Sequence, residues 1–219
     1  MNIGGACLLC HNHTFMTMIM KRSIEEALRN RRSYYAIGDE SPVSYEVIEK
    51  ILDDALTYTP SAFNSQSTRL VLLLGDAHRR FWNITQETLR ALVAPETYNK
   101  SREKIETSFA AGHGTVLFYE DSAVVESMQS RFPLYADRFP VWSQQTSAMH
   151  QLAVWTMLED VGFGASLQHY NPLVDDAVRR EWKLPVTWQL NAQMPFGKPL
   201  LEPGDKEIAP LEYRLKVFR

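Results

Sequence analysis

Hydrophobic positions along the chain recur at spacings that predict helices in some segments and strands in others. Between Ser44 and Pro60 the apolar side chains lie three and four residues apart, which is the spacing of one helical face. The same spacing is found over residues 77–94. Residues 141–164 are apolar nearly all round and end on two glycines, so we expect a buried central helix there.

Two shorter segments carry signals for the start of a helix. Ser23 is followed three residues later by Glu26, a capping-box pattern that predicts a helix running out near residues 30–33. Asn171 is followed by a proline, and these residue types suit the cap and the first position of a helix. A helix is therefore predicted over residues 171–183.

Strands are predicted where apolar residues run together or alternate with polar ones. Residues 69–75 and 115–121 are short apolar runs typical of buried strands, and residues 165–170 are expected to form a third. Residues 186–197 alternate, with apolar side chains on one side and glutamine or asparagine on the other, and so does the tail, residues 210–219. Helices and strands interleave without a strict βαβ rhythm. We therefore predict an α+β fold with one sheet of about five strands flanked by helices.

Polar segments between these elements read as loops rather than as linkers. Residues 60–69, PSAFNSQSTR, lead directly into a strand, and residues 95–112 are predicted to form a surface helix or a mobile flap. No internal repeat or low-complexity tract divides the chain. We expect a flexible leader over residues 1–19 and a single domain over residues 20–219.

Composition and charge narrow the classes of partner. The chain has 219 residues, of which 45% are hydrophobic and 22% charged, as is ordinary for a globular protein. A net charge of −3 offers no overall attraction to nucleic acid or to an anionic membrane. No apolar run is long enough for a membrane helix. Neither nucleic acid nor membrane is therefore expected as a partner.

Both cysteines lie within the first ten residues. Cys7, Cys10 and His11 match the C-x-x-C-H pattern of haem attachment, but no secretory segment precedes them, and the crowded set suits no structural zinc site. We expect no metal here. The rest of the chain has no cysteine and therefore no disulfide, as is typical of a cytoplasmic protein.

The common signatures of nucleotide-binding loops, serine hydrolases and zinc proteases are absent from the sequence. Two polar segments remain. Arg31, Arg32 and Ser33 can donate to a phosphate, although cations at the end of a helix also suit its dipole. The segment SAFNSQ, residues 61–66, offers hydroxyls and carboxamides that can both donate and accept, although these residues also fill ordinary turns.

Taken together, four segments resemble one known family. They are NRRSYYA, PSAFNSQ, GFGASLQHYNP, and MPFGKP with DKEIAPLEYRLKVF, in this order. The combination resembles the FMN-dependent nitroreductase family, most of all its branch of short members related to the yeast Hbn and Frm proteins. The resemblance covers roughly residues 20–219. It implies a largely antiparallel central sheet and a homodimer whose subunits exchange their C-terminal segments.

The resemblance also implies which residues bind FMN. One subunit would contribute the segment after the first helix, the end of a strand, and a basic residue near the C-terminus: Arg31, Arg32, Ser33, Tyr35, Gln168, His169 and Lys206, with Lys198 as second choice for the basic residue. The partner subunit would contribute its polar loop: Pro60, Ser61, Ala62, Asn64 and Gln66. No catalytic side chain and no metal are expected, because the flavin carries out the chemistry at N5.

The implied activity is a ping-pong reaction in which NADH or NADPH reduces the flavin and a nitroaromatic, quinone or similar small acceptor is reduced in turn. Residues 132–142 are candidates for a wall over the flavin, with Phe109 and Tyr98 on a flap; plain packing is the alternative. The tail would add a strand to the partner's sheet, or else form an edge strand of its own sheet. The competing function is a flavin-binding regulator of lipid or stress signalling with little turnover.

Overall fold

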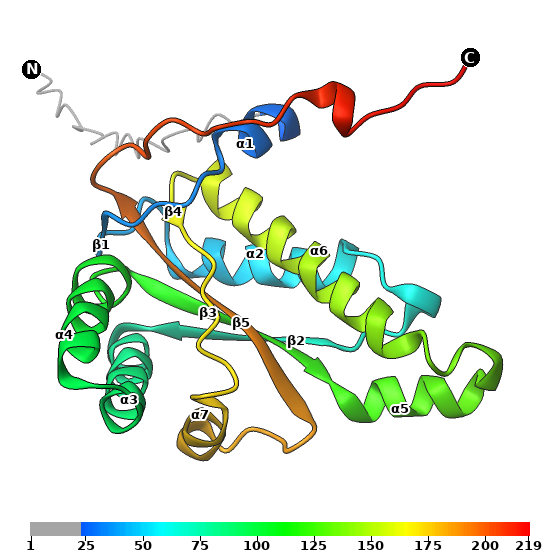
Figure 1. The fold of residues 1–219 in the computed structure, drawn as a ribbon, viewed down its shortest axis with the longest axis horizontal. Helices are drawn as coiled ribbons and strands as arrows, with labels where there is room; N and C mark the ends of the chain where they lie inside the picture. The colour runs from blue at the N-terminus through cyan, green and yellow to red at the C-terminus, as the bar shows by residue number, and fades with distance from the viewer. Residues whose placement is uncertain (1–22) are drawn as a thin grey trace, which may run out of the picture.

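A computed structural model describes residues 23–219, in which an antiparallel sheet lies between two helical layers (Figure 1). The strand order is β1-β5-β3-β2, with β4 also paired to β5, and every pairing is antiparallel. The predicted α+β fold is thereby confirmed. The strands are β1 (Ile37–Gly38), β2 (Thr68–Leu74), β3 (Gly114–Asp121), β4 (Gly164–Ala165) and β5 (Trp188–Pro199).

Five of the seven helices in residues 23–219 begin within two residues of the predicted position; the helix at 122–131 was not predicted, and the one predicted from Asn171 begins at Asp175. The capping box forms as expected, because the Ser23 hydroxyl accepts from the Glu26 amide and the Glu26 carboxylate accepts from the Ser23 amide. The helices are α1 (Ile24–Asn30), α2 (Tyr45–Tyr58), α3 (Gly75–Leu92), α4 (Pro95–Lys104), α5 (Ser122–Arg131), α6 (Phe139–Asp160) and α7 (Asp175–Trp182). Short turns complete them: η1 (Ala62–Asn64), η2 (Ile105–Phe109), η3 (Pro133–Tyr135) and η4 (Leu211–Tyr213).

Alternate residues of β3 supply two separate hydrophobic cores, one on each face of the sheet. Val116 and Phe118 pack with α2 and α6, whereas Leu117 and Tyr119 pack with α3, η2 and α7. Figure 1 shows α2 and α6 on one side of the strands and α3, α4 and α7 on the other. The sheet is thus covered on both faces.

A β-bulge at Asn191 corrects the predicted alternation of β5. Phe118 pairs with Ala192 and Tyr119 with Leu190, so Asn191 is an extra residue on this strand. Ala192 therefore faces the α2–α6 core and Leu190 faces the opposite core. The pattern had placed both on one side, because alternation alone does not reveal an inserted residue.

Three predicted segments near β5 differ from the structure. The strand expected over residues 165–170 is reduced to β4 and a single bridge at Gln168. Between them, the Ser166 amide donates to the carbonyl of Pro195, but Pro195 has no amide hydrogen to donate in return, so the pairing is incomplete. Asn171 caps no helix, because α7 begins at Asp175 and the Asn171 side chain accepts from Gln193 instead. The alternative that the tail forms an edge strand of its own sheet is also wrong: residues 204–219 are exposed and hold only η4.

Two further predictions concern burial. Helix α6 is not buried all round: Val141, Met149 and Leu152 are each at least 41% exposed, while Ser147 and His150 on its inner face are buried. Residues 95–109 are helical as predicted, as α4 and η2, but Phe109 is fully buried against Trp82 and does not belong to a flap. The predicted leader and its cysteines lie outside the described residues.

Candidate functional site

The segment after α1 lies alongside β4. Helix α1 ends at Asn30, where the Arg31 amide still donates to the carbonyl of Ala27. The next residues then pair with the sheet, because Ser33 bridges to Ala165 and the Tyr34 amide donates to the Ala165 carbonyl at 3.0 Å. These bonds fix the backbone that carries the two arginines.

Arg31 is held in place by an aromatic ring yet keeps an unused donor. Its guanidinium lies 4.4 Å from the ring centroid of Trp155 on α6, a cation–π contact. Its Nε is buried and has no hydrogen-bond partner. Burial, and then the neighbouring charge of Arg32, lower the pKa of Arg31 from its usual value. A half-buried cation with an unsatisfied buried donor is suited to an anionic ligand.

Arg32 joins this segment to the C-terminal part of the chain. Its Nη2 donates to the carbonyl of Gly204 at 2.7 Å, and the amide of Leu200 donates to the carbonyl of Ala36 at 2.9 Å. Within residues 23–219, no carboxylate lies within ion-pair distance of Arg31 or Arg32.

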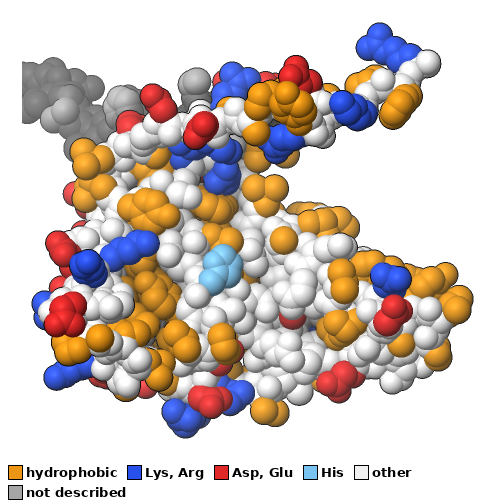
Figure 2. Space-filling model, viewed as in Figure 1, with side chains coloured by type: hydrophobic (Ala, Val, Ile, Leu, Met, Phe, Trp, Pro, Cys, Tyr) orange, Lys and Arg blue, Asp and Glu red, His pale blue; other side chains and the backbone are white. Residues whose placement is uncertain are grey.

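A cavity of about 580 Å³ opens between these two segments. Figure 2 shows basic side chains gathered beneath the C-terminal segment. The cavity brings together five of the predicted site residues, Arg31, Arg32, Ser33, Tyr35 and Lys206. Two carboxylates, Glu202 and Asp205, also line it, so the described cations exceed the anions by one.

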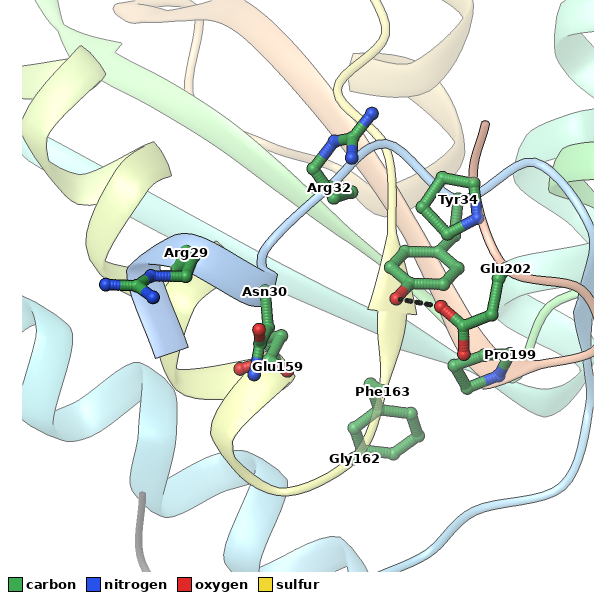
Figure 3. A pocket seen from close by; sticks show the side chains of 10 residues that line it. Arg29, Asn30, Arg32, Tyr34, Glu159, Gly162, Phe163, Pro199 and Glu202 are labelled. Carbon is green, nitrogen blue, oxygen red and sulfur yellow. Dashed lines mark hydrogen bonds between the residues drawn. The ribbon is translucent and has the colours of Figure 1, made fainter. Parts of the chain in front are cut away.

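A second cavity, of about 370 Å³, adjoins the first and shares some of its lining residues. In Figure 3 the Tyr34 hydroxyl points at Glu202, to which it donates at 3.3 Å. Gly164 is required beneath this tyrosine, because a Cβ there would come within 2.7 Å of the Tyr34 ring. Arg32 and Tyr34 line both cavities, so the contacts that shape one also shape the other.

The polar loop 60–66 does not line the cavity that holds Arg31. It joins α2 to β2, and Phe63 within it packs on Trp142, whereas Arg31 packs on Trp155. The two tryptophans are thirteen residues apart on α6, which corresponds to about 20 Å along the helix. The predicted loop residues, Pro60, Ser61, Ala62, Asn64 and Gln66, therefore do not line the cavity of Arg31 within one chain.

The remaining predicted residues lie nearer the arginines in the fold but outside the cavity. Gln168 exchanges backbone hydrogen bonds with Gln193, at 2.7 and 2.9 Å, and follows β4, to which Ser33 is bridged. His169 is exposed. Lys198 forms an ion pair with Glu40 and does not line the cavity, whereas Lys206 does.

Sequence reasoning missed two residues that hold the predicted ones. Trp155 lies under Arg31, but the two are distant in sequence and no pattern links them. Phe63 is an apolar residue in a polar loop, so the sequence does not indicate a role for it, yet its ring contacts four of the aromatic side chains in residues 132–142. Those aromatic side chains therefore pack on one another, which agrees with the packing alternative given for residues 132–142.

Over the part of the chain that the structure describes, no helix has both the length and the apolar character needed to cross a bilayer.

Comparisons with known proteins agree with this arrangement. Residues 28–198 match the model of the nitroreductase family. HBN1 of Saccharomyces cerevisiae is 34% identical over 183 residues, which cover 83% of this chain and 90% of the yeast protein. The nitroreductase FRM2 of the same yeast is 33% identical over 182 residues, covering 82% and 90%.

Solved structures agree as well. The nitroreductase CinD from Lactococcus lactis superimposes with a TM-score of 0.82 and is 41% identical, over 90% of this chain and all of that one; its structure is a complex with 4-nitrophenol. CinD has also been solved in complex with nicotinic acid, with a TM-score of 0.80.

Proposed function

The chain belongs to the nitroreductase family, and from this premise we propose that it is an FMN-dependent oxidoreductase. In this proposal NADH or NADPH is the reductant, and a nitroaromatic, quinone or similar small acceptor is reduced by a ping-pong mechanism. The ligands of CinD, 4-nitrophenol and nicotinic acid, are flat aromatic molecules. Such shapes suit stacking on a flavin.

One observation supports this proposal most. Arg31 and Arg32 lie at one cavity with Lys206, and the buried Nε of Arg31 lacks a partner. The phosphate of FMN carries close to two negative charges and three acceptor oxygens, so guanidinium and ammonium donors fit it. Ser33 adds a hydroxyl donor beside them. These residues would bind the phosphate end, and Tyr35 would lie next to it.

We further propose a homodimer in which the partner subunit's loop 60–66 completes the site. The separation of about 20 Å along α6 between the tryptophan that contacts Phe63 and the one that contacts Arg31 supports an exchange between subunits. The exposed apolar residues of α6 support it too, because an apolar helix face of this kind is suited to a partner surface. Residues 211–219, from η4 to the C-terminus, stand away from the body (Figure 1) and would extend onto the partner.

Bound FMN would supply the redox chemistry at its N5 atom, accepting and passing on electrons. The residues of this chain bind and orient it. Arg31, Arg32 and Lys206 neutralise the phosphate, and the backbone around Gln168 and His169, fixed to β5 by the bonds to Gln193, would border the flavin. No proton-transferring side chain is required of the chain in this scheme.

Purified protein tests the proposal directly. A yellow protein with flavin absorption, the size of a dimer, that turns over NADH or NADPH with a nitroaromatic acceptor is the expected result. Tight FMN binding without turnover would favour a regulatory flavoprotein instead. A protein that stays colourless after FMN is added would contradict the proposal.

A further inference from the structure

Phe63, in the middle of the polar loop 60–66, packs among four aromatic side chains. One precedes η3, one lies in η3 and two lie on α6. Its ring centroid lies 4.8 Å from that of Phe132, 5.4 Å from Phe139, and 5.8 Å from both Tyr135 and Trp142. We call these five rings the aromatic clamp. Phe63 is 47% exposed, so its contacts fix the ring without burying it in a core.

The backbone of the same loop is strained. Phe63, Asn64 and Gln66 have φ angles of 54°, 51° and 50°, in the left-handed region. This region is unfavourable for side chains with a Cβ, and phenylalanine tolerates it less well than asparagine does. Three such residues within four positions persist only where surrounding contacts hold them.

Other contacts secure the ends of the loop. The Gln66 amide donates to the hydroxyl of Ser61 at 3.0 Å, and Nη1 of Arg69 donates to the Gln66 carbonyl at 2.8 Å. Arg69 is itself paired with Asp121 at 3.1 Å. The left-handed turn at Phe63 lies between these anchors, and its aromatic ring is what ties it to α6.

The loop also presents unused polar groups. Among the residues that the structure describes, the side-chain carboxamides of Asn64 and Gln66 make no hydrogen bond, although each can donate and accept. A strained backbone that displays free carboxamides is typical of a binding loop held ready in advance.

We infer that Phe63 is a positioning residue, whose ring, seated in the aromatic clamp, holds loop 60–66 in the conformation that presents Asn64 and Gln66 to the flavin. The inference rests on the proposed function, in which this loop contacts FMN of the partner subunit. Phe63 acts through the loop: because the clamp orders the loop before the ligand arrives, binding does not have to order it.

Three variants test the role of the ring. Phe63→Ala removes it, Phe63→Tyr keeps it, and Leu92→Ala removes a 58% exposed side chain at the end of α3 as a control. Two quantities are measured on each full-length protein: the rate of amide hydrogen exchange over residues 61–67 without FMN, and the dissociation constant of FMN. A Phe63→Leu variant replaces Phe63→Ala if the latter does not fold.

Phe63→Ala is expected to speed exchange in the loop and to weaken FMN binding by about tenfold, because the loop must then be ordered on binding. Phe63→Tyr and Leu92→Ala are expected to match the wild type in both. Unchanged exchange, or faster exchange with unchanged FMN affinity, would overturn the inference. Failure of the wild type to bind FMN would instead remove the proposed function, while the exchange rates would still report whether the clamp orders the loop.

Discussion

The guanidinium of Arg32 donates a hydrogen bond of 2.7 Å to the carbonyl of Gly204, a residue 172 positions further along the chain. This contact ties the segment after α1 to the segment after β5. As a result Lys206, two residues beyond Gly204, lines the same cavity as Arg31 and Arg32. The proposed phosphate site thus draws its residues from both ends of the described chain.

The two lysines near the C-terminus are expected to differ in their effect on FMN binding. Lys206 lines the cavity, whereas the ammonium of Lys198 is paired with Glu40 outside it. Lys206→Ala should weaken FMN binding by about 1–1.5 kcal/mol, roughly 5–12-fold, through loss of one charge-assisted contact. Lys198→Ala, the matched control, should change the dissociation constant by less than about twofold. Fluorescence titration measures both, and an equal loss in the two variants would remove Lys206 from the site.

Trp155 is expected to act on FMN binding through Arg31. The centroid of its ring lies 4.4 Å from the guanidinium carbon, so Trp155→Leu keeps an apolar side chain but removes the cation–π contact. We expect FMN affinity to fall by about 0.5–1.5 kcal/mol. In an Arg31→Ala background, Trp155→Leu should lower FMN affinity little further, because the guanidinium that Trp155 contacts is already absent. Additive losses in the double variant would show that Trp155 acts independently of Arg31.

His78 is expected to make stability depend on pH. Its Nε2–H donates to the Ala110 carbonyl, and its Nδ1 accepts from the Thr115 hydroxyl, which itself accepts from Trp82. Burial lowers the pKa of His78 from 6.5 to about 4. Since the unfolded chain takes up the proton near pH 6.5 and the folded chain only near pH 4, stability is complete above pH 6.5 and falls as the pH drops toward 4. The loss from this group is roughly 2–4 kcal/mol.

Urea unfolding at several pH values measures this dependence. The His78→Gln variant lacks the titrating group, so its free energy of unfolding should fall less steeply between pH 6.5 and 4 than that of the wild type. Parallel curves for the two proteins would show that His78 does not carry the effect.

A buried carboxylate between β3 and α6 is expected to matter for stability. Glu120, 2% exposed, accepts hydrogen bonds from the hydroxyls of Ser67, Thr68 and Ser143. In Glu120→Gln one acceptor oxygen becomes an amide donor, which should lower the free energy of unfolding by about 1–3 kcal/mol. Glu126→Gln, on the exposed side of α5, is the control and should change it by less than about 0.5 kcal/mol. Equal unfolding midpoints would contradict this account of Glu120.

Local sequence patterns predicted several helices correctly. The features that they did not predict in the sheet depend on contacts between strands. The capping box at Ser23 and the spacing over residues 45–58 are properties of neighbouring residues, and both helices form. The bulge at Asn191 and the interruption at Pro195 depend on which strand lies alongside, so no single segment indicates them. β1 is only two residues long, too short to show any spacing.

The basic residues that line the candidate site could be predicted from the sequence. Arg31 and Arg32 were predicted from a polar segment and Lys206 from the family resemblance, and the structure brings the three to one cavity. The residues that hold them could not be predicted in this way, because Trp155 contacts Arg31 only through the fold and Phe63 is apolar. Supporting contacts of this kind carry no local signature.

The measurement that tests the central claim most directly compares FMN with riboflavin, which lacks the phosphate. Dissociation constants of both ligands are determined for the wild type and for Arg31→Ala. If Arg31 binds the phosphate, the wild type should prefer FMN strongly, and Arg31→Ala should lose about 1.5–3 kcal/mol for FMN while its riboflavin affinity stays nearly constant. Equal binding of the two ligands by the wild type, or an equal loss for both in Arg31→Ala, would contradict the account.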